Sequence, residues 1–339
     1  MTKAVANTNR IPEIDVLKGF AMICMIIGHS IIVYPIDISQ VGWCQSLHNF
    51  IYSFHMEILF MLSGFLYKKK DYASYYKGKI SRILIPYLIW GAIFLLMPVI
   101  FSSVVHRDTS LFDGLKNYAL YGGGYWFLYA LFLIFIIYPL IDLLGRWLKV
   151  ILLVGLIAVN YLFAIPSIFC FEQVMWYLPF FMMGDLLRDL NNMIGAGNYS
   201  GNFAGITCLI FIATYLINEY VTIPNYFHHF IKSVSIIGIM CVLARYIFAI
   251  LSETKDIVLR GFVSINSLCG KYSLQLYLFN GFLLVLLRVL LCSVLHVTNP
   301  IVIVFVISSV DIIVSLLVCV YILPKSKVLS FICGVKAAK

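Results

Sequence analysis

Residues 14–35 read IDVLKGFAMICMIIGHSIIVYP, and this stretch decides the class of fold. It is long and apolar enough to cross a bilayer as one helix, which needs about 20 mostly apolar residues. It nevertheless carries Asp15, Lys18 and His29, whose side chains are expensive to place at membrane depth. The stretch therefore predicts a membrane-spanning helix whose polar residues face other helices or a wet interior.

The composition extends this prediction to the whole chain. Of the 339 residues, 62% are hydrophobic and 12% are charged, whereas a soluble domain has about 25% charged residues. These values exclude a soluble globular enzyme, a disordered chain and a nucleic-acid-binding protein. The nine cysteines lie mostly inside apolar runs and form no CxxC pair. We therefore expect them to be small buried side chains, and we expect no metal site.

Further apolar segments repeat the pattern of the first one. They predict an all-α integral membrane protein of about ten transmembrane helices. Loops are short throughout, so we expect a single domain over residues 1–339, multi-pass in the plasma (inner) membrane. The fifth and sixth segments are the shortest, and Pro166 and Pro179 interrupt them. The predicted spans are 14–35, 47–67, 83–104, 122–144, 149–166, 172–188, 203–220, 230–251, 270–291 and 300–323.

The basic residues predict the orientation of these spans. With the N-terminus in the cytoplasm, an even number of spans places twenty of the 24 basic residues on the cytoplasmic side. Cytoplasmic loops of membrane proteins carry an excess of Lys and Arg. We therefore expect both termini to be cytoplasmic, and we attribute the net charge of +9 to topology rather than to nucleic-acid binding.

The first span supplies the candidate catalytic residues. Eleven residues, or three helical turns, separate Lys18 from His29, so the two lie within about 20° on one face and about 16 Å apart along the axis. Asp15 lies near the same stripe. Because an imidazole exchanges protons near neutral pH, His29 is the candidate base, with Lys18 and Asp15 beside it. The alternative is that His29 only hydrogen-bonds between helices and that Lys18 reaches the membrane surface.

The second span predicts a substrate pocket. His48, Tyr52 and His55 follow i, i+4, i+7 spacing and so share a face, and His55 reaches a depth similar to that of the first-span histidine. Glu57 lies about 200° from His55, on another side of the helix. We assign Tyr52, His55 and Glu57 to the pocket, together with Ser63. For His48 and Tyr52 the alternative is a polar seam between helices, and Ser63 with the glycine after it suits close helix packing.

A basic hairpin follows the second span. Six basic residues lie from Lys68 to Arg82, next to Tyr67. Topology explains most of these charges. The sharper hypothesis is a docking surface for an anionic cytoplasmic ligand with phosphates, formed by Lys68, Lys79 and Tyr67, with Arg82 binding a phosphate in bidentate geometry.

Three further residues complete the candidate list. Trp126 follows three glycines at the predicted outer mouth of the fourth span. It either stacks on a sugar ring in the substrate pocket or belongs to the aromatic belt of the membrane interface. Asp311 and Arg288 are predicted buried charges to which the sequence assigns no role.

Taken together, these motifs resemble the membrane-bound acyltransferase family 3. The resemblance covers nearly the whole chain, and its parts occur in the family's order. They are the basic residue, ten residues, then histidine of Lys18–His29; Phe54-His55-Met56 followed by Phe60-Met61-Leu62-Ser63-Gly64-Phe65; Arg82-Ile83-Leu84-Ile85-Pro86-Tyr87; Tyr125-Trp126-Phe127-Leu128; and Gly270-Lys271-Tyr272-Ser273 leading to Tyr277.

The resemblance implies a function. Members have a ten-helix fold and move an acyl group, usually acetyl, from cytoplasmic acyl-CoA to a carbohydrate hydroxyl. His29 is similar to the catalytic histidine, and Lys18 stands in its partner position. We thus expect an O-acetyltransferase whose donor substrate is acetyl-CoA, with no resident cofactor, a carbohydrate acceptor and the lipid bilayer as its surroundings. The alternatives are succinyl transfer to an exopolysaccharide and a transporter or flippase for a polysaccharide precursor. The oligomeric state stays open.

Overall fold

The structure is a computed structural model that describes residues 11–32, 38–68, 71–100, 111–194, 201–220, 225–253 and 256–335. Within these ranges the chain forms helices and turns and no strand. The class predicted from the sequence, all-α, is confirmed. Parts of some predictions, such as residues 33–35, 69–70 and 101–104, lie outside the described ranges.

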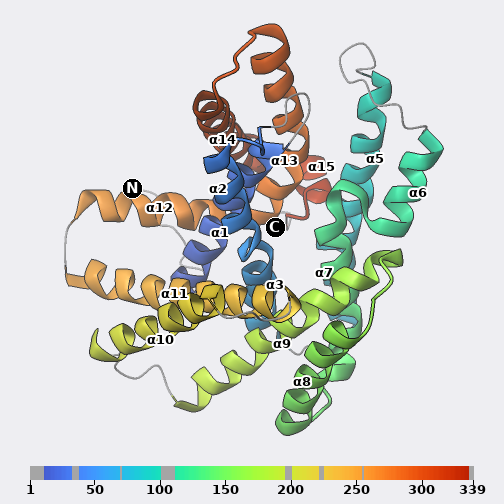
Figure 1. The fold of residues 1–339 in the computed structure, drawn as a ribbon. Helices are drawn as coiled ribbons and strands as arrows, with labels where there is room; N and C mark the ends of the chain where they lie inside the picture. The colour runs from blue at the N-terminus through green and yellow to red at the C-terminus, as the bar shows by residue number, and fades with distance from the viewer. Residues whose placement is uncertain are drawn as a thin grey trace.

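The α-helices alternate with short 3-10 or π-helical turns, which carry the label η (Figure 1). In chain order the elements are α1 (Pro12–Ile32), α2 (Gly42–Tyr52), α3 (His55–Phe65), α4 (Tyr72–Lys79), η1 (Ile80–Leu84), α5 (Ile85–Ile100), α6 (Leu111–Tyr121), η2 (Gly123–Tyr125), α7 (Trp126–Ile141), α8 (Arg146–Leu162), η3 (Ile168–Cys170), α9 (Phe171–Ile194), α10 (Gly201–Tyr220), α11 (Asn225–Glu253), α12 (Ile257–Lys271), α13 (Ser273–Arg288), η4 (Val289–Val294), α14 (Pro300–Leu317), η5 (Val318–Ile322), η6 (Leu323–Lys325) and α15 (Lys327–Ile332).

Helix α1 runs through the middle of the molecule and contacts α3, α11, α12, α13 and α14 (Figure 1). Its most extensive contact is with α12, a helix that the sequence analysis did not predict as a separate element. Glycines allow this contact, because a Cβ on Gly19 would lie 1.8 Å from the Asn266 carbonyl oxygen and one on Gly270 would lie 1.8 Å from that of Asp15. The two backbones therefore touch at two points, in antiparallel order.

Helices α3 and α9 pack in the same way. A Cβ on Gly64 would lie 1.9 Å from the Phe181 carbonyl oxygen, and one on Gly184 would lie 1.9 Å from that of Met61. The close packing that the sequence allowed for Ser63 and the glycine after it is therefore present at Gly64. This contact joins the helix that begins at His55 to the helix that lines the pocket described below.

The second predicted span is not one helix. It breaks at Ser53 and Phe54 into α2 and α3, and Phe54 has the non-helical backbone angles φ −150° and ψ −22°. Side chains add hydrogen bonds at the break: Ser233 Oγ on α11 donates to the Ser53 carbonyl at 2.6 Å, and His55 Nδ1 donates at 2.8 Å to the Ile51 carbonyl, which also accepts from the Phe54 N–H. Tyr52 and His55 therefore lie on different helices, so the predicted i, i+4, i+7 face is wrong as one continuous helix.

The sequence predicts that Pro179 interrupts the sixth span, but the structure shows no interruption there. Pro179 lies inside α9, which continues for 24 residues. A proline has no N–H, so the carbonyl four residues earlier loses its donor. That carbonyl belongs to Met175, and Asn160 Nδ2 on α8 donates to it at 2.8 Å. The neighbouring helix thus supplies the missing hydrogen bond, and α9 stays intact.

Pro139 in α7 shows the same compensation. The carbonyl four residues earlier belongs to Phe135, and it accepts a hydrogen bond from the Tyr75 hydroxyl at 3.0 Å. Tyr75 lies on α4, which continues through η1 into α5 as one apolar helix over Tyr72–Leu96. Part of the predicted basic hairpin is therefore helical and docked against α7.

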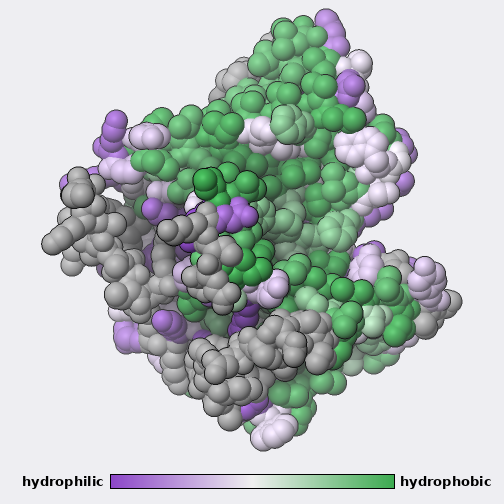
Figure 2. All heavy atoms as spheres, turned by 90° about the vertical axis from the view of Figure 1, so that its left-hand side faces the viewer, coloured by the Kyte–Doolittle hydropathy of each residue, from purple (hydrophilic) through white to green (hydrophobic). Residues whose placement is uncertain are grey.

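The exterior of the molecule is apolar. Figure 2 shows broad hydrophobic surface with hydrophilic residues mostly near its margins. On α14, for example, Phe305 is 71% exposed and Ile301 is 64% exposed. Large apolar side chains are exposed in this way when lipid surrounds them. The chain is therefore a multi-pass membrane protein.

Six helical stretches of the described chain are long and apolar enough to cross a membrane. They are Pro12–Ile32, Tyr72–Leu96, Phe112–Ile141, Asn225–Leu251, Ser273–Val294 and Pro300–Lys325. The predicted number of about ten is not confirmed. One reason is physical: α2 and α3 have 11 residues each, so each is about 16 Å long, against a hydrocarbon core of about 30 Å.

The contact between α1 and α12 yields a stability prediction. We expect Gly270→Ala to lower the free energy of unfolding by roughly 1–3 kcal/mol, because the new methyl group overlaps the backbone of α1. Gly261→Ala in the same helix is the matched control, since its Cβ would have no atom within 4 Å. Thermal unfolding in detergent measures both variants. Equal melting temperatures would show that the backbones do not touch at Gly270.

The Pro179 compensation yields a second prediction. Asn160→Leu leaves the Met175 carbonyl without a donor, so we expect a loss of about 1–3 kcal/mol in stability. In a Pro179→Ala background the new N–H at position 179 supplies that donor, and the same Asn160→Leu change should then have a much smaller effect. Unfolding measurements on the four proteins of this cycle test it. An identical loss in both backgrounds would contradict the assigned role of Asn160.

Candidate functional site

The candidate base His29 lies near the C-terminal end of α1, half-buried, within a group of stacked rings. Its ring centroid is 6.1 Å from that of Tyr52. Tyr52 is 3.9 Å from His48 and 4.8 Å from His55. We call His29, His48, Tyr52 and His55 the histidine cluster. The structure thus brings together side chains that the sequence placed at a similar depth on two spans.

The hydrogen bonds of the cluster define which ring nitrogens are available. Because His55 Nδ1 donates to the Ile51 carbonyl, Nε2 is the nitrogen left as an acceptor in the neutral ring. His48 Nε2 is buried with no hydrogen-bond partner in the part of the chain that the structure describes. Such an imidazole group can accept a proton from a hydroxyl and pass it on.

Lys18 and Asp15 lie at the other end of α1. Both are half-buried, as His29 is. The three-turn spacing to Lys18 leaves about 16 Å between the two levels along the helix axis. Next to Asp15, the backbone of α1 meets Gly270 of α12. The structure therefore keeps Lys18 and His29 on one helix but does not place them side by side.

Glu57 joins the histidine cluster to a second polar group. It lies in the first turn of α3, two residues after His55, and is 2% exposed. Its Oε1 accepts a hydrogen bond from Trp176 Nε1 at 3.2 Å and lies 3.3 Å from His229 Nε2. Its Oε2 is buried, and none of the described residues hydrogen-bonds to it. Glu57 thus faces α9 and α11, away from His55, as its helical position predicts.

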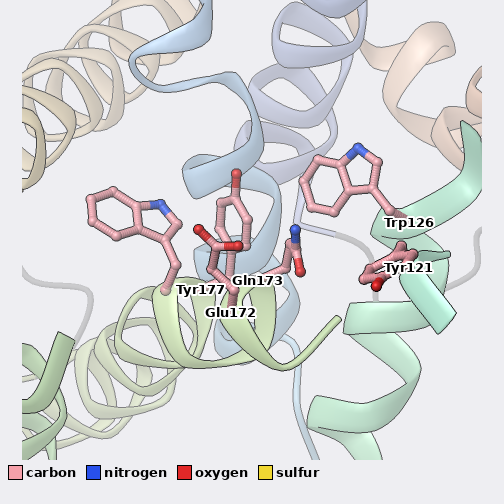
Figure 3. A pocket seen from close by; sticks show the side chains of 6 residues that line it. Tyr121, Trp126, Glu172, Gln173 and Tyr177 are labelled. Carbon is pink, nitrogen blue, oxygen red and sulfur yellow. The ribbon is translucent and has the colours of Figure 1, made fainter. Parts of the chain in front are cut away.

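A pocket of about 320 Å³ opens beside Trp176 (Figure 3). Its lining residues come from the start of α9 and from the α6–α7 connection: Tyr121, Trp126, Glu172, Gln173, Trp176 and Tyr177. Gly122 has φ 76°, and this left-handed turn lets the chain reverse between Tyr121 and Trp126, so both reach the same pocket. Trp126 therefore lines a pocket, and its stacking on a sugar ring stays a prediction.

A charged cluster lies beyond the other end of α3. Tyr67, just past that end, donates its hydroxyl to Asp142 Oδ2 at 3.3 Å. Lys149 Nζ bridges two carboxylates, with 2.7 Å to Asp142 and 2.9 Å to Asp185. Arg188 donates to Asp185 and to the Tyr67 carbonyl. Two acidic and two basic side chains thus balance, which a buried charged group requires.

The residues predicted to bind the phosphates of acyl-CoA have different surroundings. Tyr67 is 3% exposed and is held by the charged cluster, and Lys68 next to it is exposed. Lys79 Nζ lies 3.1 Å from the centroid of the Phe135 ring on α7, a cation–π contact. Arg82 is exposed, and its backbone carbonyl lies next to Gly334.

The comparisons with known proteins identify the family. The acyltransferase domain matches residues 11–322, which is most of the chain. The chain belongs to this acyltransferase family. The resemblance drawn from its motifs is thereby confirmed.

Two curated relatives are similar in sequence to part of this acyltransferase. Nodulation protein NolL of Mesorhizobium japonicum is 26% identical over 188 residues, or 54% of this chain and 49% of that protein. Nodulation protein NolL of Sinorhizobium fredii is 25% identical over 147 residues, or 41% of this chain and 39% of that protein. The chain thus spans about half the length of the curated relatives it matches, or less. No solved structure gives a significant match.

The remaining candidates are Ser63, Asp311 and Arg288, and none of them belongs to either cluster or to the pocket lining. Ser63 Oγ donates to the Leu59 carbonyl in its own helix at 2.7 Å. Asp311 is fully buried and accepts from Asn280 Nδ2 at 2.7 Å and from Ser315 at 3.0 Å. Arg288 donates to the Ser30 carbonyl, one residue beyond His29. These contacts give Asp311 and Arg288 structural partners that the sequence did not indicate.

Sequence reasoning missed most of the pocket. Glu172, Gln173, Trp176 and Tyr177 fall within the first two turns of α9, where an acid, an amide and two aromatic residues interrupt an apolar span. That local composition could have predicted a polar site in the sequence. No sequence pattern indicates His229, because only the fold brings α11 against Glu57. The buried carboxylates of the charged cluster were also missed.

Proposed function

We propose that this chain is a membrane O-acyltransferase that moves an acetyl group from cytoplasmic acetyl-CoA to a hydroxyl of a cell-surface or lipid-linked carbohydrate, with His29 as general base. The single observation that carries the proposal is the histidine cluster in the interior of an acyltransferase-family membrane protein. The pocket at the start of α9 and the basic surface near Tyr67 support it, because the reaction needs one site for each substrate.

The proposed chemistry is one acyl transfer. His29 accepts the proton of the acceptor hydroxyl as its oxygen attacks the thioester carbonyl. A carbon–oxygen bond forms, the carbon–sulfur bond breaks, and the proton held by His29 passes to the departing thiolate, which leaves as the thiol. His48, which stacks on Tyr52, and His55, whose ring is tilted against it, provide further nitrogen atoms that can orient the hydroxyl.

The proposed orientation follows the basic residues. It puts the Lys18 end of α1 and the charged cluster on the cytoplasmic side, with both termini there, and the His29 end toward the outer side of the plasma membrane. The donor then enters from the Arg82 side, and its acyl arm extends about 16 Å along α1, from the level of Lys18 to that of His29. We propose one catalytic membrane domain on this basis.

His29 is the first residue to test. We expect His29→Ala to fold normally and to reduce acyl transfer by roughly 10²–10⁴-fold, which is the usual contribution of a positioned base. The assay follows labelled acetyl-CoA incubated with purified protein in detergent, with transfer and hydrolysis measured together. His296→Ala is the matched control, because His296 is exposed. Activity close to the unmodified level in His29→Ala would remove it from the mechanism.

Arg82 tests the donor site. We expect Arg82→Ala to weaken acyl-CoA binding by about 1.5–3 kcal/mol, the range for a hydrogen bond to a charged group. Lys77→Ala is the matched control: Lys77 is also exposed, and its position is about 140° around the helix from that of Arg82. Titration of the detergent-solubilised protein with acetyl-CoA measures both. Equal affinities in the two variants would leave Arg82 as a topological charge.

A further inference from the structure

The pocket at the start of α9 has the lining of a sugar-binding site. Its walls are two tryptophans and two tyrosines, and its polar groups are one carboxylate and one amide. We propose that this pocket binds a neutral pyranose ring of the acceptor and excludes anionic sugars. The inference rests on the proposed function, since it assigns the acceptor site of that reaction.

The aromatic walls are held rigidly. Trp126 stacks on Tyr177 with ring centroids 5.5 Å apart, and Tyr177 stacks on Phe60 of α3 at 4.3 Å. On the α9 side, the hydrogen bond from Trp176 Nε1 to Glu57 fixes the second indole. Aromatic faces fixed in this way offer a flat apolar surface, which suits the C–H face of a pyranose ring without loss of side-chain freedom.

The polar groups of the pocket call for hydrogen-bond donors. Gln173 Oε1, in the lining of the pocket, is buried with no hydrogen-bond partner among the residues that the structure describes. Buried oxygens of this kind are normally satisfied. Sugar hydroxyls are donors, so a bound pyranose is a ligand that matches this oxygen as well as the rings.

The charge of the pocket selects among sugars. Figure 3 shows Glu172, Gln173 and Tyr177 rising from the start of α9, with Trp126 and Tyr121 facing them from the α6–α7 side. Glu172 is exposed, and it is the one charged side chain in the lining. A carboxylate with no compensating cation in the lining repels uronates and sugar phosphates, which leaves neutral sugars as the favoured class.

The first turn of α3 connects the pocket to the proposed base. His55 at its start contacts Tyr52 of the histidine cluster, and Glu57 two residues later contacts Trp176 of the pocket wall. The same helical turn therefore borders both sites. In this proposal a pyranose between Trp126 and Trp176 is bound on the α9 side of this turn, and the hydroxyl to be acylated is the one that extends past the turn toward the histidine cluster.

Direct binding tests the inference without the acyl-transfer reaction. The protein in lipid nanodiscs is studied by saturation-transfer NMR with three probes: methyl glucopyranoside, methyl glucuronide and glucose 6-phosphate. We expect saturable binding of the neutral probe and at least tenfold weaker binding of both anionic probes. Absence of neutral-sugar binding, or equal binding of the anionic probes, overturns the proposal.

Variants locate the bound sugar. We expect Gln173→Ala to weaken binding of methyl glucopyranoside about tenfold, through the lost hydrogen bond, and Trp126→Ala to abolish it. Trp147→Ala, at an 80% exposed tryptophan of α8, is the matched control and should bind normally. If Trp126→Ala fails to fold, Gln173→Ala still decides the location. Unchanged binding in Gln173→Ala places the sugar elsewhere and overturns the proposal.

A separate variant tests whether the charge of Glu172 excludes anionic sugars. Glu172→Gln should raise the affinity for methyl glucuronide to within a few-fold of that for the neutral probe, and unchanged discrimination would contradict the role of Glu172. These results are independent of the proposed reaction. Sugar binding without His29-dependent turnover of acetyl-CoA would refute the acyl transfer alone, and turnover without sugar binding would refute the acceptor pocket alone.

Discussion

Backbone carbonyls that lose the donor of their own helix shape this protein. A bilayer interior offers no water to replace a missing donor, so another helix must supply it. The donor–acceptor pairs are Tyr75 with the Phe135 carbonyl, Asn160 with that of Met175, and Ser233 with that of Ser53. Each proline or break in a helix is therefore accompanied by a hydrogen bond from another helix. Together these hydrogen bonds hold α3, α7 and α9, the helices that carry the candidate sites.

Helix α3 lies between the candidate sites, with the histidine cluster and the pocket at its first turn and the charged cluster just past its last turn. Its first turn carries His55 and Glu57, one toward the histidine cluster and the other toward the pocket, and just past its last turn Tyr67 joins the charged cluster. The glycine contact with α9 holds α3 between these groups. A helix of 11 residues can do this because the break at Ser53 lets it leave the direction of α2. The proposed acceptor and donor sites thus lie at opposite ends of one short element.

The charged cluster and the pocket use buried charge in different ways. In the charged cluster two carboxylates are balanced by Lys149 and Arg188, which makes it a structural anchor for α7, α8 and α9. At the pocket the acidic side chains have other partners: Glu172 is exposed in the lining, and Glu57, behind Trp176, contacts an indole and an imidazole. A balanced group stabilises the fold, whereas an unbalanced one is available to a ligand.

The sequence by itself determined the all-helical membrane class, the family and the main candidates, because apolar length and the spacing of Lys18, His29, His55 and Arg82 are local properties of the chain. The tertiary structure decided which of them meet. It broke the second span at Ser53, kept α9 continuous through its proline, and brought α11 against Glu57. These outcomes depend on donors that come from residues far away in the chain, and no periodicity within one segment reports where such a partner lies.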